Sequence, residues 1–374
     1  MNYIDGFRNP EVAAQFVRKI AEQGRALAEQ GRRVHIMEVC GSHTMAIGRY
    51  GIRPLLPENV ELISGPGCPV CVTDPGYIDT ALALAKRGAI IATFGDMVRV
   101  PGSESDLTSC RSQGGDVRVC YSPSAAIELA KSCPEREVVF LAIGFETTIA
   151  PVISLVGEAL RDGVKNLSLL TAFKVVPPAL RALLADPEIR IDAFLCPAHV
   201  SAIIGARAYE PLVSEFRVPC VIAGFEPLDI LYGVHGILAQ MLNREAKVEN
   251  QYARVVRPEG NLKAQALIAQ YLEPVDAAWR GMGVIPASGL GLRSAFSSYD
   301  AEKRFEAPVR PGKLHAGCRC GDVIKGKFRP TSCALFAAAC TPDHPVGPCM
   351  VSAEGTCAAY FKYGLSDEAQ GDKK

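Results

Sequence analysis

Short apolar runs alternate with longer amphipathic stretches along the first two-thirds of the chain. Runs rich in Val, Ile and Leu predict strands at residues 33–39, 60–64, 89–93, 117–120, 138–143, 167–172, 191–195 and 220–223. Continuous apolar runs of this length are typical of parallel strands that are buried on both faces. The spacing of apolar residues predicts helices at 77–87, 125–132, 149–161 and 261–272. This alternation of strands and helices favours a doubly wound α/β fold.

The pattern divides into two such α/β halves, followed by a third part of different character. We expect two doubly wound parallel-sheet domains around a cleft, at residues 1–122 and 123–245. Glycine and proline then become frequent, and from Gly317 onward the chain is rich in cysteine. A segment of this composition supplies little core of its own. We therefore expect residues 246–374 to form a C-terminal iron–sulfur domain, in which binding of a cluster contributes to folding.

Charge and hydropathy exclude some classes of protein. The chain has 40 basic and 40 acidic side chains, so it lacks the basic excess that a nucleic-acid-binding surface requires. It has no uncharged apolar run of about 18 residues, as a membrane helix needs, and its first residues lack the pattern of a secretory signal. We expect a soluble cytoplasmic protein with no nucleic-acid or membrane partner.

The chain has 14 cysteines, which in a reducing compartment indicate metal or redox chemistry rather than disulfides. Four thiols in the loop-rich tail fit the ligand set of a 4Fe-4S cluster, and these are Cys333, Cys340, Cys349 and Cys357. The alternative is a zinc ribbon, although structural zinc usually has closely paired cysteines. The nearby thiols of Cys318 and Cys320 are candidates to replace one of these four ligands. The imidazoles of His315 and His344 are weaker candidates for the same role.

The sequence Cys68-Pro-Val-Cys71 is a CxxC motif that precedes a predicted helix. Thr73 or Asp74 suits the N-cap of this helix, and Pro75 suits its first position. A helix N-terminus favours the thiolate form and lowers the pKa of a nearby thiol. The motif therefore predicts a pair that closes reversibly to a disulfide. Half of a zinc site is the alternative, but the sequence contains no second CxxC.

Cys40 and His43 lie within one turn after the first predicted strand. A soft thiolate and an imidazole suit iron, copper or zinc. The alternative is a buried cysteine followed by a histidine that caps a helix. Because ligands of open α/β sheets bind at the carboxyl ends of strands, we expect this loop and the Cys68–Cys71 loop to share one cleft.

Acidic groups at other predicted strand ends are candidates for acid–base catalysis. We take Asp96 and Glu146 as candidate catalytic residues, although each is equally suited to a turn or a helix N-cap. The same holds for Glu226 and Asp229, and His199 is a further candidate for the cleft. The remaining cysteines without a spacing partner are expected to be small buried side chains, and they are Cys110, Cys120, Cys133 and Cys220.

Three segments together resemble the HypD family of hydrogenase-maturation proteins. They are Met37-Glu-Val-Cys-Gly-Ser-His-Thr-Met45, Gly65-Pro-Gly-Cys-Pro-Val-Cys71 and the tail from Cys333 to Cys357, which ends Pro345-Val-Gly-Pro-Cys-Met-Val-Ser-Ala-Glu-Gly-Thr-Cys357. The resemblance spans nearly the whole chain in the expected order. One difference is Met45, since many members of the family have a second histidine there.

The resemblance implies a scaffold on which the Fe(CN)2CO unit of nickel–iron hydrogenases is assembled. It implies that Cys40 is an iron ligand shared with a small partner, HypC, and that Cys68 and Cys71 relay electrons. The same resemblance assigns the 4Fe-4S cluster to the four tail cysteines, and it makes a second partner, HypE, the donor of cyanide.

Two other functions compete with the scaffold. One is an iron–sulfur-dependent protein disulfide reductase that uses Cys68 and Cys71, although such an enzyme has no use for Cys40-Gly-Ser-His43. The other is a zinc-stabilised interaction module without redox activity. A brown protein with broad visible absorption would exclude a tail that binds zinc alone.

Overall fold

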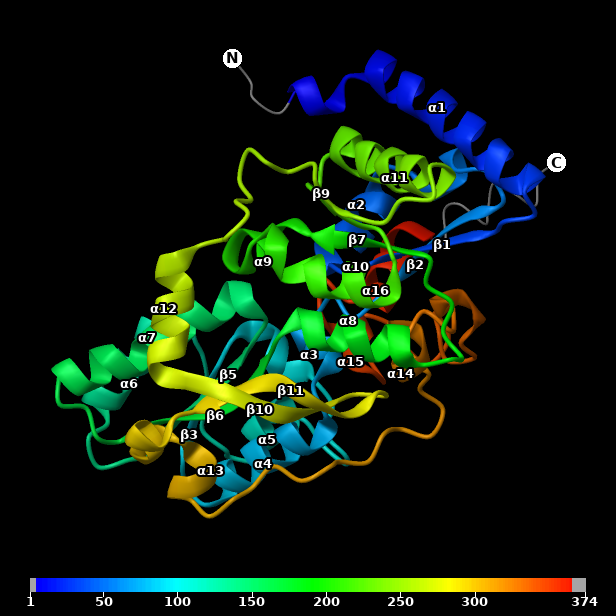
Figure 1. The fold of residues 1–374 in the computed structure, drawn as a ribbon. Coiled ribbons are helices and arrows are strands. Elements are labelled where there is room, and N and C mark those ends of the chain that lie inside the picture. The colour runs from blue at the N-terminus through cyan, green and yellow to red at the C-terminus, as the bar shows by residue number, and fades with distance from the viewer. Residues whose placement is uncertain (1–4, 365–374) are drawn as a thin grey trace.

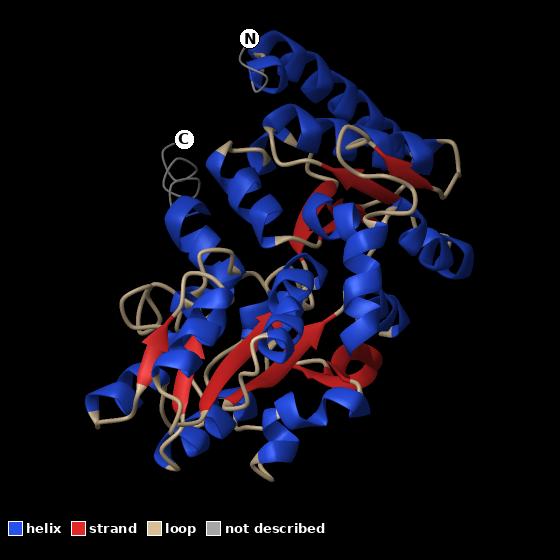
Figure 2. Ribbon diagram, turned by 90° about the vertical axis from the view of Figure 1, so that its left-hand side faces the viewer, coloured by secondary structure: helices blue, strands red, loops and turns tan. Residues whose placement is uncertain are grey.

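The structure is a computed structural model that describes residues 5–364. It contains two β-sheets, one above the other in Figure 1, and a turn of the view in Figure 2 shows the same separation. The upper sheet has five parallel strands in the order β2-β1-β7-β8-β9. Their bounds are β1 (Val34–Glu38), β2 (Val60–Ser64), β7 (Ala193–Pro197), β8 (Cys220–Ala223) and β9 (Val248–Asn250).

The lower sheet has six strands in the order β10-β11-β6-β5-β3-β4. Four of them are parallel, and β10 and β11 form an antiparallel hairpin that extends the sheet at the β6 edge. Their bounds are β3 (Ile90–Thr93), β4 (Val117–Val119), β5 (Val138–Gly144), β6 (Leu167–Lys174), β10 (Leu272–Trp279) and β11 (Gly283–Leu292). The eight strands expected from the apolar runs are therefore present, and the mixed α/β class with parallel sheets is confirmed.

Helices cover the sheets and connect the parallel strands (Figure 1). The longest begins after Asn9, whose side chain accepts the backbone N–H groups of Glu11 and Val12, with Pro10 at the first position. The helices are α1 (Pro10–Glu29), α2 (Gly41–Arg49), α3 (Pro69–Val72), α4 (Pro75–Lys86), α5 (Leu107–Ser112), α6 (Ser124–Ser132), α7 (Glu146–Arg161), α8 (Val176–Ala185), α9 (Ala198–Ile204), α10 (Glu210–Phe216), α11 (Pro227–Leu242), α12 (Leu262–Tyr271), α13 (Ala301–Arg304), α14 (Cys320–Ile324), α15 (Pro348–Val351) and α16 (Thr356–Ala359). Within residues 5–364, no helix is both long and apolar enough to cross a membrane.

The strand pairing does not follow the expected division of the chain at residue 122. Strands β3 and β4 pair with β5 and β6, while β1 and β2 pair with β7 and β8. The chain thus passes from the upper to the lower sheet after β2 and returns after β6. All these strands are similar apolar runs, and such runs do not specify which neighbour they pair with.

The expected start of a separate C-terminal domain at residue 246 also differs from the structure. Strand β9 completes the upper sheet, and the β10–β11 hairpin completes the lower one. Only the cysteine-rich segment after α13 stands apart from both sheets. Its helices return to the upper sheet, where α16 contacts α2, and both α14 and α15 contact α3.

Candidate functional site

The Cys40 loop lies directly against the CxxC loop. Cys40 is the N-cap residue of α2, and the next backbone N–H, that of Gly41, donates to the Gly67 carbonyl oxygen at 3.1 Å. A Cβ atom on Gly67 would lie 2.5 Å from the Cys40 carbonyl carbon, so only glycine fits there. The two loops follow the neighbouring parallel strands β1 and β2. They therefore lie against each other at the carboxyl edge of this sheet, which is the arrangement that the expected shared cleft requires.

The Cys40 thiol is 8% exposed and strongly held in its protonated form. The pKa of Cys40 is raised to about 12, mainly by burial and then by the nearby Glu354 carboxylate, while the backbone amides of His43 and Ser42 act in the opposite direction. The Ser42 hydroxyl donates to Glu354 at 3.0 Å. A metal cation would have to displace this proton, and the resulting thiolate would then be stabilised by the metal charge.

His43 is fully buried, and its ring has one free nitrogen. Nε2 lies 2.9 Å from the Gly224 carbonyl oxygen and 3.1 Å from that of Ala223, so Nε2 carries the hydrogen and donates it. Nδ1 has no hydrogen-bond partner among the described residues. Burial lowers the pKa of His43 to about 4, which keeps the ring neutral. The unprotonated Nδ1 has a free lone pair and is therefore suited to bind a metal.

The CxxC motif forms a helical turn of its own. Cys68 is the N-cap residue of α3, and its Sγ accepts the backbone N–H of Cys71 at 3.3 Å. The expected helix start is confirmed, since Asp74 caps α4 by accepting the Gly76 N–H at 2.9 Å and Pro75 follows it. Burial raises the pKa of Cys71 well above its ordinary value.

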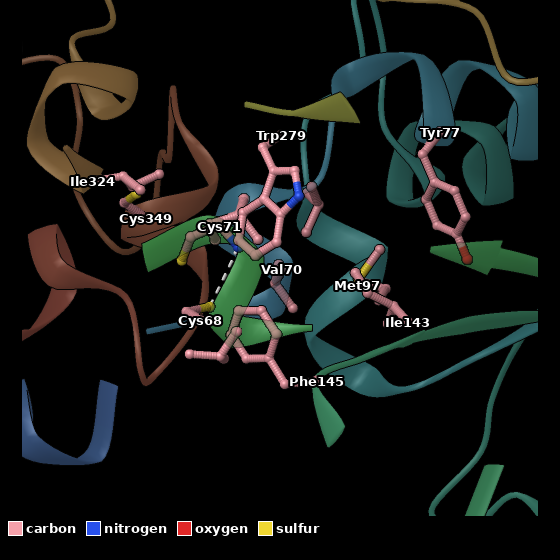
Figure 3. Packing of buried hydrophobic residues seen from close by; sticks show 14 of the residues in the cluster. Cys68, Val70, Cys71, Tyr77, Met97, Ile143, Phe145, Trp279, Ile324 and Cys349 are labelled. Carbon is pink, nitrogen blue, oxygen red and sulfur yellow. Dashed lines mark hydrogen bonds between the residues drawn. The ribbon is translucent and has the colours of Figure 1, made fainter. Parts of the chain in front are cut away.

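The lower sheet contacts the CxxC motif through Trp279, the only tryptophan in the chain. Figure 3 shows the indole lying against the Cys68–Cys71 segment, with Phe145 close by. Trp279 forms a β-bridge with Thr73, and its ring stacks on that of Phe145 at 6.0 Å. The carboxyl edges of both sheets thus meet at the CxxC motif.

Trp279 should report the redox state of the CxxC pair. Diamide, a small thiol oxidant, is expected to take two electrons and two protons from Cys68 and Cys71, which then form a disulfide. Because a disulfide beside an excited indole quenches it, we expect fluorescence to fall on oxidation and to recover with dithiothreitol. The change should be absent in Cys68→Ala and intact in Cys110→Ala. Two thiols that titrate above the free value of about 8.5, and that form no disulfide on mild oxidation, would indicate a structural role instead.

Six cysteines line one small cavity in the C-terminal segment. We call it the thiol cavity, and its cysteines are Cys318, Cys320, Cys333, Cys340, Cys349 and Cys357. Most of its other lining side chains are apolar, and they include Val323, Leu335, Phe336 and Met350. The four expected cluster ligands therefore come together, and the structure adds Cys318 and Cys320 to them. His315 and His344 are not among the residues that line it.

Cys349 joins the thiol cavity to the CxxC motif. Its thiol lies beside those of Cys71, Cys320 and Cys357, each of which affects its pKa. The Cys71 Sγ also lies 3.8 Å from the Pro348 carbonyl oxygen, and Figure 3 shows Cys349 beside Cys71. A continuous row of sulfur atoms therefore runs from Cys68 into the cavity.

The thiol cavity fits a cluster better than a single ion. In residues 5–364 no three His, Cys, Asp or Glu side chains converge closely enough to hold one metal ion. The thiols instead surround an apolar space, as the ligands of separate irons do. The Cys340 Sγ accepts the Val346 N–H at 3.3 Å, and such bonds stabilise cluster-bound sulfur.

The other candidates have different surroundings. Asp96 is exposed in a 3-10 turn, and no contact links it to the thiols. Glu146 is buried, its Oε1 accepts the Val176 N–H at 2.8 Å, and burial raises its pKa to about 7. Glu226 and Asp229 form the capping box of α11, which is the structural alternative. Capping of α11 is therefore enough to explain why Glu226 and Asp229 stand at these positions, without an acid–base role.

The cysteines without a spacing partner, and His199, have neighbours in the fold that the sequence did not indicate. Cys110, Cys120 and Cys220 are buried as expected, whereas Cys133 is partly exposed. Cys220 is in hydrogen-bond contact with Cys196 on the neighbouring strand. His199 is exposed, and its ring lies 4.5 Å from that of Phe225, which also contacts His43.

Sequence reasoning missed a buried carboxyl group beneath the Cys40 loop. Glu38 ends β1, and its Oε1 accepts the hydroxyls of Thr44 at 2.7 Å and Ser64 at 2.6 Å. Burial raises the pKa of Glu38 to about 7. The sequence could have indicated this group, because a glutamate at the end of an otherwise apolar strand needs a hydrogen-bond partner when it is buried. Glu38 fixes the first turn of α2, which carries His43.

Fold and site together define a thiol-rich α/β protein whose cysteines gather where two sheets meet. The family model named HypD, described as the hydrogenase formation hypA family, matches residues 13–364. The hydrogenase maturation factor HypD of Cupriavidus necator is 46% identical over 97% of this chain and 97% of its own. That of Azotobacter vinelandii is also 46% identical, over 99% of this chain and 98% of its own. HypD of Escherichia coli is 44% identical over 97% of this chain and 98% of its own. The chain belongs to the HypD family of hydrogenase maturation factors, which confirms the resemblance.

Proposed function

We propose that this chain is the scaffold on which the Fe(CN)2CO unit of nickel–iron hydrogenases is assembled. The observation that carries the proposal is the continuity of the site. The Cys40 loop packs on the CxxC loop, and the thiol of Cys71 contacts that of Cys349 in the thiol cavity. An iron ligand, a redox pair and a cluster site would then be neighbours, as stepwise assembly of a reduced iron centre requires.

Iron is the substrate of this site, and Cys40 is its proposed ligand from this chain. The Cys40 proton leaves to solvent as iron binds, and the neutral His43 offers Nδ1 as a second candidate donor. A HypC-type partner would supply a further cysteine, and a HypE-type partner would deliver cyanide. The Glu354 carboxylate beside Cys40 offsets part of the positive charge of the metal.

The thiol cavity is proposed to hold a resident 4Fe-4S cluster on Cys333, Cys340, Cys349 and Cys357. Such a cluster supplies electrons one at a time. The protein holds Cys349 against Cys71, which brings the redox pair next to one of the proposed ligands. Most of the cavity lining is apolar, which excludes water and protects the sulfur ligands.

Burial disfavours the protein disulfide reductase as an alternative. Cys68 and Cys71 are only 4% and 2% exposed, so the disulfide of a protein substrate could not reach them without a large rearrangement. A small iron complex or an electron from a neighbouring cluster meets no such obstacle. The structure thus favours an internal partner for the redox pair.

Complementation tests the scaffold. In a bacterium that has lost its own HypD, expression of this chain should restore nickel–iron hydrogenase activity, whereas Cys40→Ser and Cys71→Ala should each give less than about a tenth of it. Cys110→Ala, which changes a buried thiol away from the site, is the matched control and should restore full activity. Equal activity with Cys40→Ser would contradict the proposal.

A further inference from the structure

Arg280 is a buried cation fixed to the end of the CxxC helix. It follows Trp279 at the tip of the β10–β11 hairpin and is only 4% exposed. Its Nε–H donates to the Thr73 carbonyl oxygen at 2.9 Å. Its backbone N–H donates to the Val72 carbonyl oxygen at 2.8 Å. The guanidinium is therefore held in place directly after Cys71 and its turn.

The same hairpin tip packs against the cysteine-rich segment. Gly281 has a φ of +75°, and a Cβ atom there would lie 2.4 Å from the Cα of Gly321. Gly321 directly follows Cys320, whose Sγ lies with that of Cys318 on the wall of the thiol cavity. The tip thus fills the space between the CxxC motif and this wall, and only glycine allows so close an approach.

The Arg280 guanidinium has no ordinary counter-ion. One of its terminal nitrogens, NH2, has no hydrogen-bond partner, and no carboxylate of residues 5–364 forms an ion pair with it. A buried, unpaired cation is costly unless an anion is nearby at some stage of function. The thiol cavity, beside which the hairpin tip packs, is the place where such an anion could form.

The hairpin tip brings Arg280 between the CxxC motif and the cavity wall. Its side chain is tied to Thr73, two residues after Cys71. Its neighbour Gly281 packs on Gly321, the residue directly after Cys320. The cation is thus fixed on the segment that joins the redox pair to the wall that carries Cys318 and Cys320.

We propose that Arg280 is the counter-charge of the thiol cavity and raises the reduction potential of the cluster bound there. The inference rests on the proposed function, because it takes the cavity to hold a 4Fe-4S cluster. Reduction adds one electron and one negative charge to the cluster, while no bond at Arg280 forms or breaks and its proton stays in place. A fixed positive charge in an apolar site stabilises the more negative, reduced state.

The test is a potentiometric titration of the full chain, purified anaerobically with its cluster, with dithionite as reductant and electron paramagnetic resonance as readout. In Arg280→Gln the ratio of reduced to oxidised cluster at a given potential should fall at least about tenfold, or ~59 mV for one electron. Arg280→Lys keeps the charge and should stay near wild type. Arg293→Gln removes a half-exposed arginine beyond the same hairpin, paired with Glu273, and should change nothing.

Each outcome bears on the proposal. An unchanged potential in Arg280→Gln overturns it, as does an equal loss in Arg280→Lys, since the hydrogen bond to Thr73 would then be the cause. Should Arg280→Gln and Arg280→Met fail to retain a cluster while Arg280→Lys retains one at the wild-type potential, the need for the charge is supported. Loss of the cluster in Arg280→Lys as well contradicts a role of charge. A wild-type chain without any cluster would instead refute the proposed function.

Discussion

Cys333→Ala is expected to lower the iron and acid-labile sulfide of the anaerobically purified chain to well below half of the wild-type content. Cys333 lines the thiol cavity with five other cysteines, and four thiolates are needed to hold a 4Fe-4S cluster. Cluster binding and folding are coupled in a segment with few apolar contacts of its own, so the C-terminal part should also become sensitive to protease. Iron and sulfide analysis, Mössbauer spectroscopy and limited proteolysis measure the three effects.

The control for this variant is Cys110→Ala, which removes a buried thiol outside the cavity and should keep both iron and sulfide. The complete scan also decides among the six thiols. The assignment made here requires that Cys340→Ala, Cys349→Ala and Cys357→Ala behave like Cys333→Ala, while Cys318→Ala and Cys320→Ala keep the cluster. Loss of iron in Cys318→Ala, together with full iron in Cys349→Ala, would replace Cys349 by Cys318 in the ligand set.

The strands could be predicted from the sequence, but their partners could not. Each strand of the parallel core is a short apolar run, and the hydrophobic pattern of a short window is enough to predict that it forms a strand. The allocation to two sheets depends on where the chain crosses between them, and no residue of β3 or β4 distinguishes them from β1 or β2. Sequence neighbours usually pair, and here that tendency fails after β2, β4, β6 and β9.

Two similar sequences show why acidic candidates were hard to judge. Gly144-Phe-Glu146 follows β5 in the lower sheet, and Gly224-Phe-Glu226 follows β8 in the upper sheet. Glu146 is buried and has a raised pKa, whereas Glu226 caps a helix and pairs with Arg8. The local sequence is the same, and the difference comes from the segments that cover each glutamate in the folded chain.

The thiols of the site were visible in the sequence, while the groups that surround them were not. Cysteine spacing pointed to the tail, but Trp279 and Arg280 reach the CxxC motif only because β10 and β11 form a hairpin. That hairpin was missed since β10 is an exposed edge strand with polar residues and Pro274, and β11 contains Gly289 and Gly291. Such strands lack the apolar signal of a buried one.

Cys40→Ser is expected to abolish the iron centre with diatomic ligands while leaving the fold and the cluster of the thiol cavity intact. Serine has nearly the same size, so the packing of the loop on Gly67 and the start of α2 should persist. A hydroxyl is, however, a hard and weakly acidic ligand, and low-spin iron that carries cyanide and carbon monoxide prefers a soft thiolate. The change therefore removes the metal bond without removing the structure around it.

Infrared spectroscopy of the anaerobic complex with a HypC-type partner measures this directly, because bound cyanide and carbon monoxide absorb where protein does not. The wild-type complex should show their bands, and Cys40→Ser should lose at least about nine-tenths of the intensity. Unchanged iron and sulfide in the variant show that the cluster has survived, since Cys40 does not line the thiol cavity. His43→Gln, which keeps a polar group beside the Gly224 carbonyl but has no imidazole, should weaken the bands less, because the thiolate is proposed as the main ligand. Bands that persist unchanged in Cys40→Ser would remove Cys40 from the iron site and would favour a purely redox role for the Cys68–Cys71 pair.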